Sequence, residues 1–291
     1  MTLEQLRIFV AVAEREHVTA AARALNLTQS AVSNAIAALE TRHDVRLFDR
    51  VGRGVALNEA GRVFLAEARG VLARAEAAEA ALTDLGALRR GRLAIFASQT
   101  IASYWLPARL IAFHARYPEV ELDVVAGNTR EAAGAVREGG AELGFVEGEI
   151  DDPALSQQVV GVDQMILVAA PSHASAAGRR VTAAGLAGAV WLMREAGSGT
   201  RSTLEAALTA AGVDPAALHV AMTLPTNEAI LAAAEAGAGI AALSQSVAAD
   251  ALAAGRLVRA PFDLPKREFR LLRHKERYRS RAANAFVALC A

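Results

Sequence analysis

The stretch TAAARALNLTQSAVSNAIAALET, residues 19–41, predicts two short amphipathic helices separated by a tight turn. Thr19 is a favourable N-cap for a helix over Ala20–Leu25. Thr28 is a favourable N-cap for the next helix, which runs from Gln29 to about Thr41. This arrangement predicts a helix-turn-helix, whose second helix can enter the major groove of DNA. Because any small helical domain can contain such a turn, the pattern alone leaves DNA binding open.

The flanking segments extend the pattern in both directions. Apolar residues at three- to four-residue spacing predict a preceding helix: Leu3, Leu6, Phe9, Val10 and Ala13. Downstream, the glycine-punctuated residues 51–57 (VGRGVAL) predict a small β-wing. Arg50 at its base and Arg53 at its tip are placed to meet phosphates or a narrow minor groove. Residues 42–54 carry four arginines against two aspartates, so the wing is locally basic.

A long helix is expected after the wing, from an N-cap at Asn58 to about Leu88. Its apolar residues follow a 4-3-4-3 spacing, which is typical of a coiled-coil seam. So narrow a stripe favours burial against a second copy of the chain, and packing on its own domain is the alternative. Gly86 and residues 89–91 predict a linker. The seam consists of Phe64, Ala68, Val71, Ala75, Ala78, Leu82 and Leu85.

From Gly91 onward, strand-like apolar runs alternate with helical segments. This alternation predicts a parallel, doubly wound α/β layer in two lobes. Chain crossings between the lobes are expected near Gly161–Asp163 and Leu264–Arg267. The expected strands are 93–96, 120–125, 143–146, 164–169, 190–193, 220–224 and 269–272, and the expected helices lie near 104–116, after Thr129, from Thr200, from Asn227 and up to Leu289.

Composition excludes several classes of protein. The 291 residues are 53% hydrophobic and 21% charged, which rules out a mostly disordered or collagen-like chain. The single cysteine, Cys290, excludes an intramolecular disulfide framework and a cysteine-cluster metal site. The longest run without a charged residue, Leu93 to Ala108, is too short and polar to span a bilayer. The first residues have no secretory pattern, so we expect a cytoplasmic protein without membrane attachment.

No catalytic constellation emerges from the sequence, and no cofactor is expected. Gly237–Ala242 matches GxGxxA but follows a helix, whereas a dinucleotide-binding motif follows a strand. Gly197-Ser198-Gly199 is not a nucleophile elbow, and no two histidines have i,i+4 spacing. Residues 266–281 hold eight bases and two acids. Such a run is more often a solvated face than a binding patch, so no function is assigned to it.

A ligand site is predicted where four strands end and helices begin. Ligands of open parallel sheets bind beyond these strand ends, and helix N-termini favour anions. Plain helix capping is the alternative at each position, but four equivalent positions in two lobes favour a small ligand between the lobes. Glu147 and Glu195 would repel a bare anion, so the ligand should carry a proton, an ammonium group or bound water. The candidate contacts are Ser98, Gln99, Thr100, Asn128, Thr129, Glu147, Glu195, Ser198, Thr200 and Thr226.

The first 61 residues resemble the LysR-type transcriptional regulators. The motifs that carry the resemblance are Ala21-Ala22, Leu25, Thr28-Gln29-Ser30-Ala31-Val32-Ser33, Ile36, Leu39-Glu40, Leu47-Phe48-Asp49-Arg50 and Glu59-Ala60-Gly61. The resemblance extends over the whole chain and implies an N-terminal winged helix-turn-helix, a long linker helix and a two-lobe α/β effector domain of periplasmic-binding-protein type. It implies domains at 1–58, 59–90 and 91–291, with lobe 1 formed by 91–162 and 268–291 and lobe 2 by 163–267.

The resemblance also implies the partners. These are double-stranded promoter DNA, a small-molecule effector, RNA polymerase, and a second copy paired through the linker helix, often within a tetramer. The residues implied to meet DNA are Thr28, Gln29, Ser30, Ser33, Asn34, Arg50 and Arg53. The sequence departs from the family at Ala37-Ala38, where a basic residue often stands, and at His43-Asp44. Fewer phosphate contacts are then available from the helix, so affinity should depend more on the wing and on dimerisation.

Within the family, the effector region looks most like the branch that controls sulfur assimilation. The matching stretches are 97–102, 127–129, 146–148 and 194–201. This likeness implies a sulfite- or sulfate-type effector, and Glu147 and Glu195 would then favour a protonated form such as hydrogen sulfite. Two other classes are alternatives. A transport-type solute-binding protein shares the two-lobe pattern but is disfavoured by the helical first 90 residues, and an α/β enzyme is disfavoured because no nucleophile–base pair is found.

Overall fold

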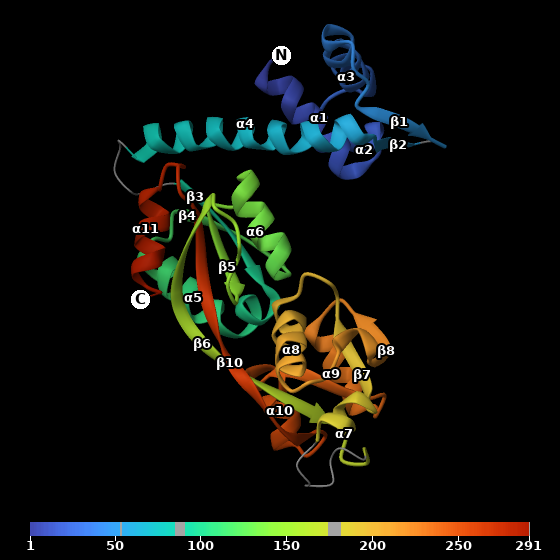
Figure 1. Ribbon diagram of the computed structural model, residues 1–291. Coiled ribbons are helices and arrows are strands. Elements are labelled where there is room, and N and C mark those ends of the chain that lie inside the picture. Colours follow the sequence, from blue (N-terminus) through green and yellow to red (C-terminus); the bar gives the residue numbers. More distant parts are fainter. Residues whose placement is uncertain (53, 85–90, 174–181, 291) are drawn as a thin grey trace. The chain divides into compact units, whose positions relative to one another are not determined.

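The described part of the chain forms two units. The computed structural model describes residues 1–52, 54–84, 91–173 and 182–290. The first unit contains three short helices, a two-stranded wing and the long helix α4; the second contains an eight-stranded sheet with helices on its faces (Figure 1). None of the described helices is long and apolar enough to cross a membrane.

The first unit begins with the predicted helix-turn-helix. Its helices are α1 (Leu3–Arg15), α2 (Val18–Ala24) and α3 (Gln29–His43). The turn between α2 and α3 is closed by Asn26, whose φ of 54° is left-handed, a conformation that asparagine tolerates. Thr28 caps α3 as predicted, because its hydroxyl accepts the Ala31 N–H at 3.2 Å.

The predicted start of the second helix is wrong. Thr19 lies inside α2, which begins at Val18 and has His17 as its N-cap. An N-cap needs an extended backbone, which His17 adopts with φ −151° and ψ 111°. Its Nδ1 accepts the Ala20 N–H at 3.4 Å, which is the role expected of Thr19.

The wing and the start of α4 hold each other in place. Strands β1 (Phe48–Val51) and β2 (Gly54–Leu57) pair antiparallel. Asn58 caps α4 (Glu59–Asp84) as predicted, since its Oδ1 accepts the Gly61 N–H at 2.9 Å. A β-carbon at Gly61 would lie 2.1 Å from the Leu47 carbonyl oxygen, so only glycine permits this approach.

The apolar seam of α4 divides into two parts. Phe64 and Ala68 pack within the first unit, where the rings of Phe9 and Phe64 are 4.8 Å apart. Farther along, Val71 is 43% exposed and Leu82 is 73% exposed. Intradomain packing therefore holds for the first part of the seam, and the exposed part leaves room for a partner. Leu85, the predicted helix end at Leu88 and the linker residues 86–90 lie outside the described residues.

The sheet of the second unit is mixed, not parallel as expected. The strand order is β4-β3-β5-β10-β6-β9-β7-β8. Strand β10 runs antiparallel to both β5 and β6, and β6 runs antiparallel to β9, whereas the other pairs are parallel. The bounds are β3 Gly91–Ser98, β4 Val120–Gly127, β5 Leu143–Glu147, β6 Leu155–Ala169, β7 Val190–Arg194, β8 His219–Leu224, β9 Ile240–Ser244 and β10 Val258–His274.

Strands β6 and β10 extend through both lobes (Figure 1). The expected crossing segments near 161–163 and 264–267 therefore lie inside continuous strands rather than between separate short ones. Each strand changes hydrophobic core on the way: Val160 packs in lobe 1, whereas Met165 packs in lobe 2. The polar residues Asp163 and Arg267 interrupt the apolar runs at this point, which is why the sequence predicted only the halves 164–169 and 269–272.

Helices cover both faces of the sheet in each lobe. In lobe 1, α5 and α11 share one core and α6 packs on another. In lobe 2, α8 and α9 belong to separate cores. The helices are η1 Ile101–Trp105, α5 Leu106–Arg116, α6 Thr129–Glu138, α7 Ala183–Ala187, α8 Gly199–Ala210, η3 Pro215–Ala217, α9 Asn227–Glu235, α10 Gln245–Ala253 and α11 Arg281–Ala288.

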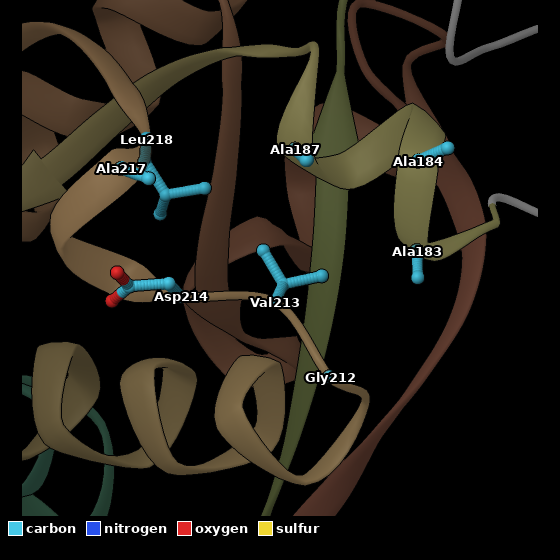
Figure 2. A pocket seen from close by; sticks show the side chains of 8 residues that line it. All are labelled: Ala183, Ala184, Ala187, Gly212, Val213, Asp214, Ala217 and Leu218. Atoms are coloured by element: carbon cyan, nitrogen blue, oxygen red, sulfur yellow. The ribbon is translucent and has the colours of Figure 1, made fainter.

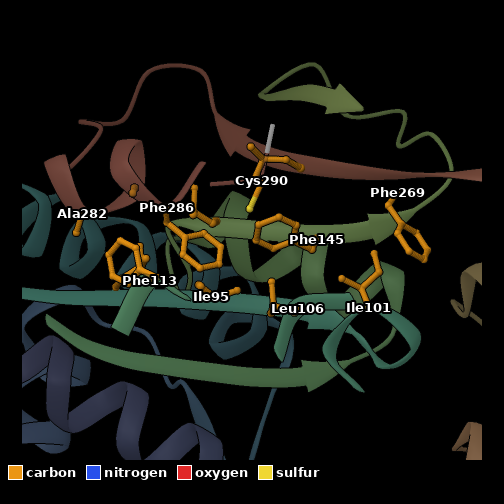
Figure 3. Packing of buried hydrophobic residues seen from close by; sticks show 14 of the residues in the cluster. Ile95, Ile101, Leu106, Phe113, Phe145, Phe269, Ala282, Phe286 and Cys290 are labelled. Carbon is orange, nitrogen blue, oxygen red and sulfur yellow. The ribbon is translucent and has the colours of Figure 1, made fainter. Parts of the chain in front are cut away.

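Cys290 belongs to the lobe 1 core, beside the rings of Phe145 and Phe286 (Figure 3). Burial raises the pKa of its thiol from 9.0 to about 11, against the opposing effect of Arg109 and Arg273. A raised pKa means that folding favours the neutral thiol. The contribution to stability is complete below pH 9 and is lost as pH rises toward 11.

We therefore expect the unfolding free energy of the wild type to fall more steeply between pH 9 and 11 than that of Cys290→Ala. Urea titrations at several pH values measure both slopes, and the stability of the two proteins at pH 7 is the reference. Equal slopes would contradict a buried neutral thiol at this position.

Candidate functional site

The exposed face of α3 carries uncharged hydrogen-bonding groups. Val32 and Leu39 are buried against the rest of the first unit, which fixes the opposite face outward. Amide and hydroxyl side chains can donate to and accept from base edges in the major groove. The hydroxyl of Thr28 also caps the helix, so this residue has a structural role as well. The exposed candidates at and after the helix start are Thr28, Gln29, Ser30, Ser33 and Asn34.

Positive charge is concentrated at the end of α3 and in the segment that follows it, up to the first strand of the wing. Arg42, Arg46 and Arg50 are exposed and form no ion pair with a described residue. Unpaired arginines of this kind are suited to phosphate contacts. Arg53, expected at the tip of the wing, lies outside the described residues.

The second polar site lies where β6 and β10 pass between the lobes, and Arg267 is at its centre. Its side chain is 3% exposed, and its Nε lies 2.8 Å from an Asp163 oxygen on the neighbouring strand. The other Asp163 oxygen accepts the Ser244 hydroxyl at 2.7 Å. The same guanidinium donates to Thr100 in lobe 1 (3.3 Å) and to Thr200 in lobe 2 (3.0 Å). One buried cation thus contacts both lobes.

This placement corrects the expectation for the basic segment 266–281. The segment is not simply a solvated face, because Arg267 is buried at the centre of the site. Other members make structural contacts: Lys275 donates to the Pro153 carbonyl at 2.7 Å. Arg277 donates to backbone carbonyls at the end of α6, where a cation stabilises the helix dipole.

The two glutamates expected to repel an anion are each paired with an arginine. Glu147 is 5% exposed, and its carboxylate lies 3.7 Å from Arg267 and accepts the Thr129 hydroxyl at 3.0 Å. Glu195 forms a two-point ion pair with Arg194 at 2.8 and 2.9 Å. Neither carboxylate is bare, contrary to the expectation, but Glu147 shares its cation with Asp163 and is only partly balanced.

The predicted ligand contacts divide into those that converge on Arg267 and those that cap helices. Thr100, Thr129, Glu147 and Thr200 belong to the Arg267 network. Among the others, Asn128 exchanges hydrogen bonds with Glu131 at the start of α6, and Thr226 caps α9. Ser198 is the N-cap residue of α8, but its side chain makes no capping bond.

The buried hydroxyls of this site have hydrogen-bond donors to spare. Thr100 accepts bonds from Arg267 and from Asn227 (3.1 Å), which fills both acceptor positions of its oxygen. No described residue accepts its proton. Thr200 likewise accepts from Arg267 without donating to a described residue. The Ser98 hydroxyl, at the same strand end as Thr100, is buried with no hydrogen-bond partner among the described residues.

Sequence reasoning missed the charged and amide members of this network. Arg194 donates to Asn227 at 2.5 Å, and Asn227 in turn donates to Thr100. Arg194 and Asn227 directly adjoin predicted contacts, so their positions at strand and helix ends were an available signal. The full set of missed residues is Asp163, Arg194, Asn227, Ser244 and Arg267.

A separate cavity of about 230 Å³ lies in lobe 2 between α7 and the segment from Gly212 to Leu218 (Figure 2). Four alanines, a glycine, a valine and a leucine form most of its lining. Its one charged residue, Asp214, uses its carboxylate to accept the Ala216 N–H at 2.9 Å. This lining offers little to orient a polar ligand, so the Arg267 network is the candidate ligand site.

Two family models together match almost the whole chain. Residues 3–62 match the bacterial regulatory helix-turn-helix protein, lysR family, and residues 86–291 match the LysR substrate binding domain. The chain belongs to the LysR family of transcriptional regulators. Members of this family regulate transcription and are not enzymes.

Individual relatives support the assignment over the full length. The HTH-type transcriptional regulator YeiE of Escherichia coli K12 is 35% identical over 293 residues, which cover 100% of this chain and 97% of that protein. Full-length CbnR in complex with its target DNA has a TM-score of 0.68 at 24% identity and covers 100% of this chain and 99% of its own. The regulatory domain of Synechocystis CcmR in complex with 2-PG has a TM-score of 0.63 at 25% identity, over 69% of this chain and 96% of that one.

Loss of Arg267 should destabilise the second unit strongly. Arg267→Met leaves the carboxylates of Asp163 and Glu147 buried without their cation, which costs about 3–5 kcal/mol for a buried pair. Thr200→Val removes a single hydrogen bond from the same guanidinium and should cost only about 1 kcal/mol. Urea unfolding followed by circular dichroism measures both, and equal losses in the two variants would contradict the central role of Arg267.

Proposed function

We propose that this LysR-type regulator binds promoter DNA in the cytoplasm as a dimer paired through α4, and that a small oxyanion between the lobes of its second unit controls it. The exposed part of the α4 seam, including Val71 and Leu82, supports pairing with a second copy. Assembly into a tetramer and contact with RNA polymerase extend this proposal from the family resemblance.

The spare hydrogen-bond donors between the lobes carry the proposal of an anionic effector. Ser98, Thr100 and Thr200 are at most 4% exposed, and each has a proton that no described acceptor takes. An oxyanion supplies acceptor oxygens without adding donors, so it satisfies all three hydroxyls. The start of α8 adds a favourable dipole. The structure of the CcmR domain with 2-PG is a precedent for a ligand complex in this fold.

Among oxyanions we favour sulfite or sulfate, because residues 97–102 and 194–201 look like the sulfur-assimilation branch of the family. Glu195 is balanced by Arg194, whereas Glu147 shares Arg267 with Asp163. An unprotonated oxyanion therefore fits the site once the Glu147 carboxylate moves away from it. Of the ten residues predicted from the sequence, the hydroxyl and amide donors, together with Arg267, are the contacts in this proposal. The carboxylates of Glu147 and Glu195 and the side-chain oxygen of Gln99 are acceptors at the edge of the site.

Binding to DNA should be sequence-selective and salt-sensitive. A titration of the protein on a duplex from upstream of its own gene, with a scrambled duplex alongside, measures the preference. Arg50→Ala should weaken binding to both duplexes. The slope of log affinity against log salt should become shallower by about 0.9, the contribution of one phosphate contact. Asn34→Ala should weaken binding to the selected duplex only, because amides read base edges. An unchanged salt slope in Arg50→Ala would remove this arginine from the DNA interface.

Binding of the effector should depend on the Thr200 hydroxyl. Titration calorimetry of the full chain with sulfite, sulfate and phosphate tests the class of ligand. Thr200→Val should weaken the anion that binds by about 10-fold or more, since a hydrogen bond to a charged group is lost. Thr209→Val on the same helix is the matched control, because its hydroxyl bonds the Glu205 carbonyl instead. Equal effects of the two variants would exclude Thr200 as a contact.

A further inference from the structure

Helix starts in each lobe are met by oxygen atoms from the other lobe. At the start of α9, in lobe 2, the Asn227 N–H donates to the Gln99 side-chain oxygen of lobe 1 at 3.1 Å. At the start of α6, in lobe 1, the Arg130 N–H donates to the Gly197 carbonyl of lobe 2 at 3.2 Å. The first N–H groups of a helix have no partner within the helix, so these contacts satisfy them across the lobes.

The start of α8 is met in a similar way by Glu147. A β-carbon on Gly199 would lie 3.0 Å from a Glu147 carboxylate oxygen and 2.8 Å from the Thr129 hydroxyl. The carboxylate of lobe 1 therefore lies against the first residue of a helix in lobe 2, where the helix dipole favours negative charge. Only glycine at position 199 allows this approach.

We propose that these contacts hold the lobes together and that an anionic effector displaces them, so that its binding loosens the contact between lobes. The inference rests on the proposed anionic effector and adds the direction in which the lobes move when it binds. Two of the helix-start N–H groups available to an oxyanion, those of Asn227 and Arg130, donate to Gln99 and Gly197. An N–H directed at one oxygen is not available to a second, so ligand and interlobe contact compete.

Charge favours the same direction. Glu147 is buried beside Arg267, and this cation already balances Asp163 at 2.8 Å. An anion that arrived without displacing Glu147 would add a further like charge to the same cluster, and like charges in a buried site are unfavourable. Movement of the Glu147 carboxylate away from α8 relieves this repulsion and separates the lobes.

The first test uses Gln99, for which competition and direct contact predict opposite results. If Gln99 only competes, Gln99→Ala frees the start of α9 and should tighten the binding of sulfite or sulfate by about 3- to 10-fold, the worth of one hydrogen bond. Titration calorimetry of the full-length protein measures this, with the exposed Gln158→Ala of lobe 1 as the control. Weaker binding in Gln99→Ala than in the control would overturn the inference.

The second test needs no ligand. Gly199→Ala places a methyl group against Thr129 and Glu147 and should push the lobes apart, whereas Gly134→Ala in α6 meets nothing closer than 3.9 Å. Spin labels at the exposed positions His114 and Ala206, in a Cys290→Ala background, report the distance between the lobes in the full chain.

We expect longer distances in Gly199→Ala than in Gly134→Ala, and a similar lengthening when an anion binds the wild type. Shortening on anion binding, or no change in a folded Gly199→Ala, would overturn the inference. If Gly199→Ala does not fold, Gln99→Ala without ligand replaces it, with the same expectation of longer distances. If sulfite, sulfate and phosphate all fail to bind, the anionic effector itself is wrong, and the ligand-free distances still decide whether these contacts hold the lobes together.

Discussion

The buried ion pair between Arg267 and Asp163 is the interaction on which the rest of the second unit depends. The two residues face each other on neighbouring strands at the point where both strands leave one lobe for the other. A buried charge is costly unless several partners compensate for it. Arg267 meets that requirement by also donating hydrogen bonds to Thr100 and Thr200. Because these threonines stand at helix starts in different lobes, the bonds bring one helix start of each lobe to the same guanidinium.

The strands that carry this pair are irregular where they pass from one lobe to the other. Strand β10 shifts register against β6 between Ala260 and Asp263 and again between Asp263 and Lys266. Such irregularities leave residues unpaired and increase local twist. A third shift follows between Phe269 and Arg270, so Arg267 and its bonds to Thr100 and Thr200 lie between irregular positions of the strand pair.

Local signals predicted the first unit well and the second only in outline. The caps Thr28 and Asn58 act on their own helices, so their roles could be predicted from neighbouring residues. His17 was missed because it is a rare N-cap compared with threonine. The antiparallel pairing of β10 could not be predicted, because strand direction depends on a partner more than 90 residues away. Arg267 was missed for the same reason. A run of charged residues is expected to be exposed to solvent, and the carboxylate that allows Arg267 to be buried, Asp163, is distant in the sequence.

Exposed arginines lie around α3, whereas Arg194 and Arg267 between the lobes are buried and paired, so salt should affect binding at the two sites differently. Around α3, exposed arginines have no acidic partner among the described residues, so their attraction to a polyanion is long-ranged and easily screened. Between the lobes, Arg194 and Arg267 are both paired and buried, where screening is weak. In the proposed function, recognition there depends on the direction of hydroxyl and backbone donors, which salt does not change. Ionic strength should therefore alter DNA affinity far more than effector affinity. The fraction of protein with bound effector would then depend on effector concentration and little on salt, whereas the fraction bound to DNA would depend on both.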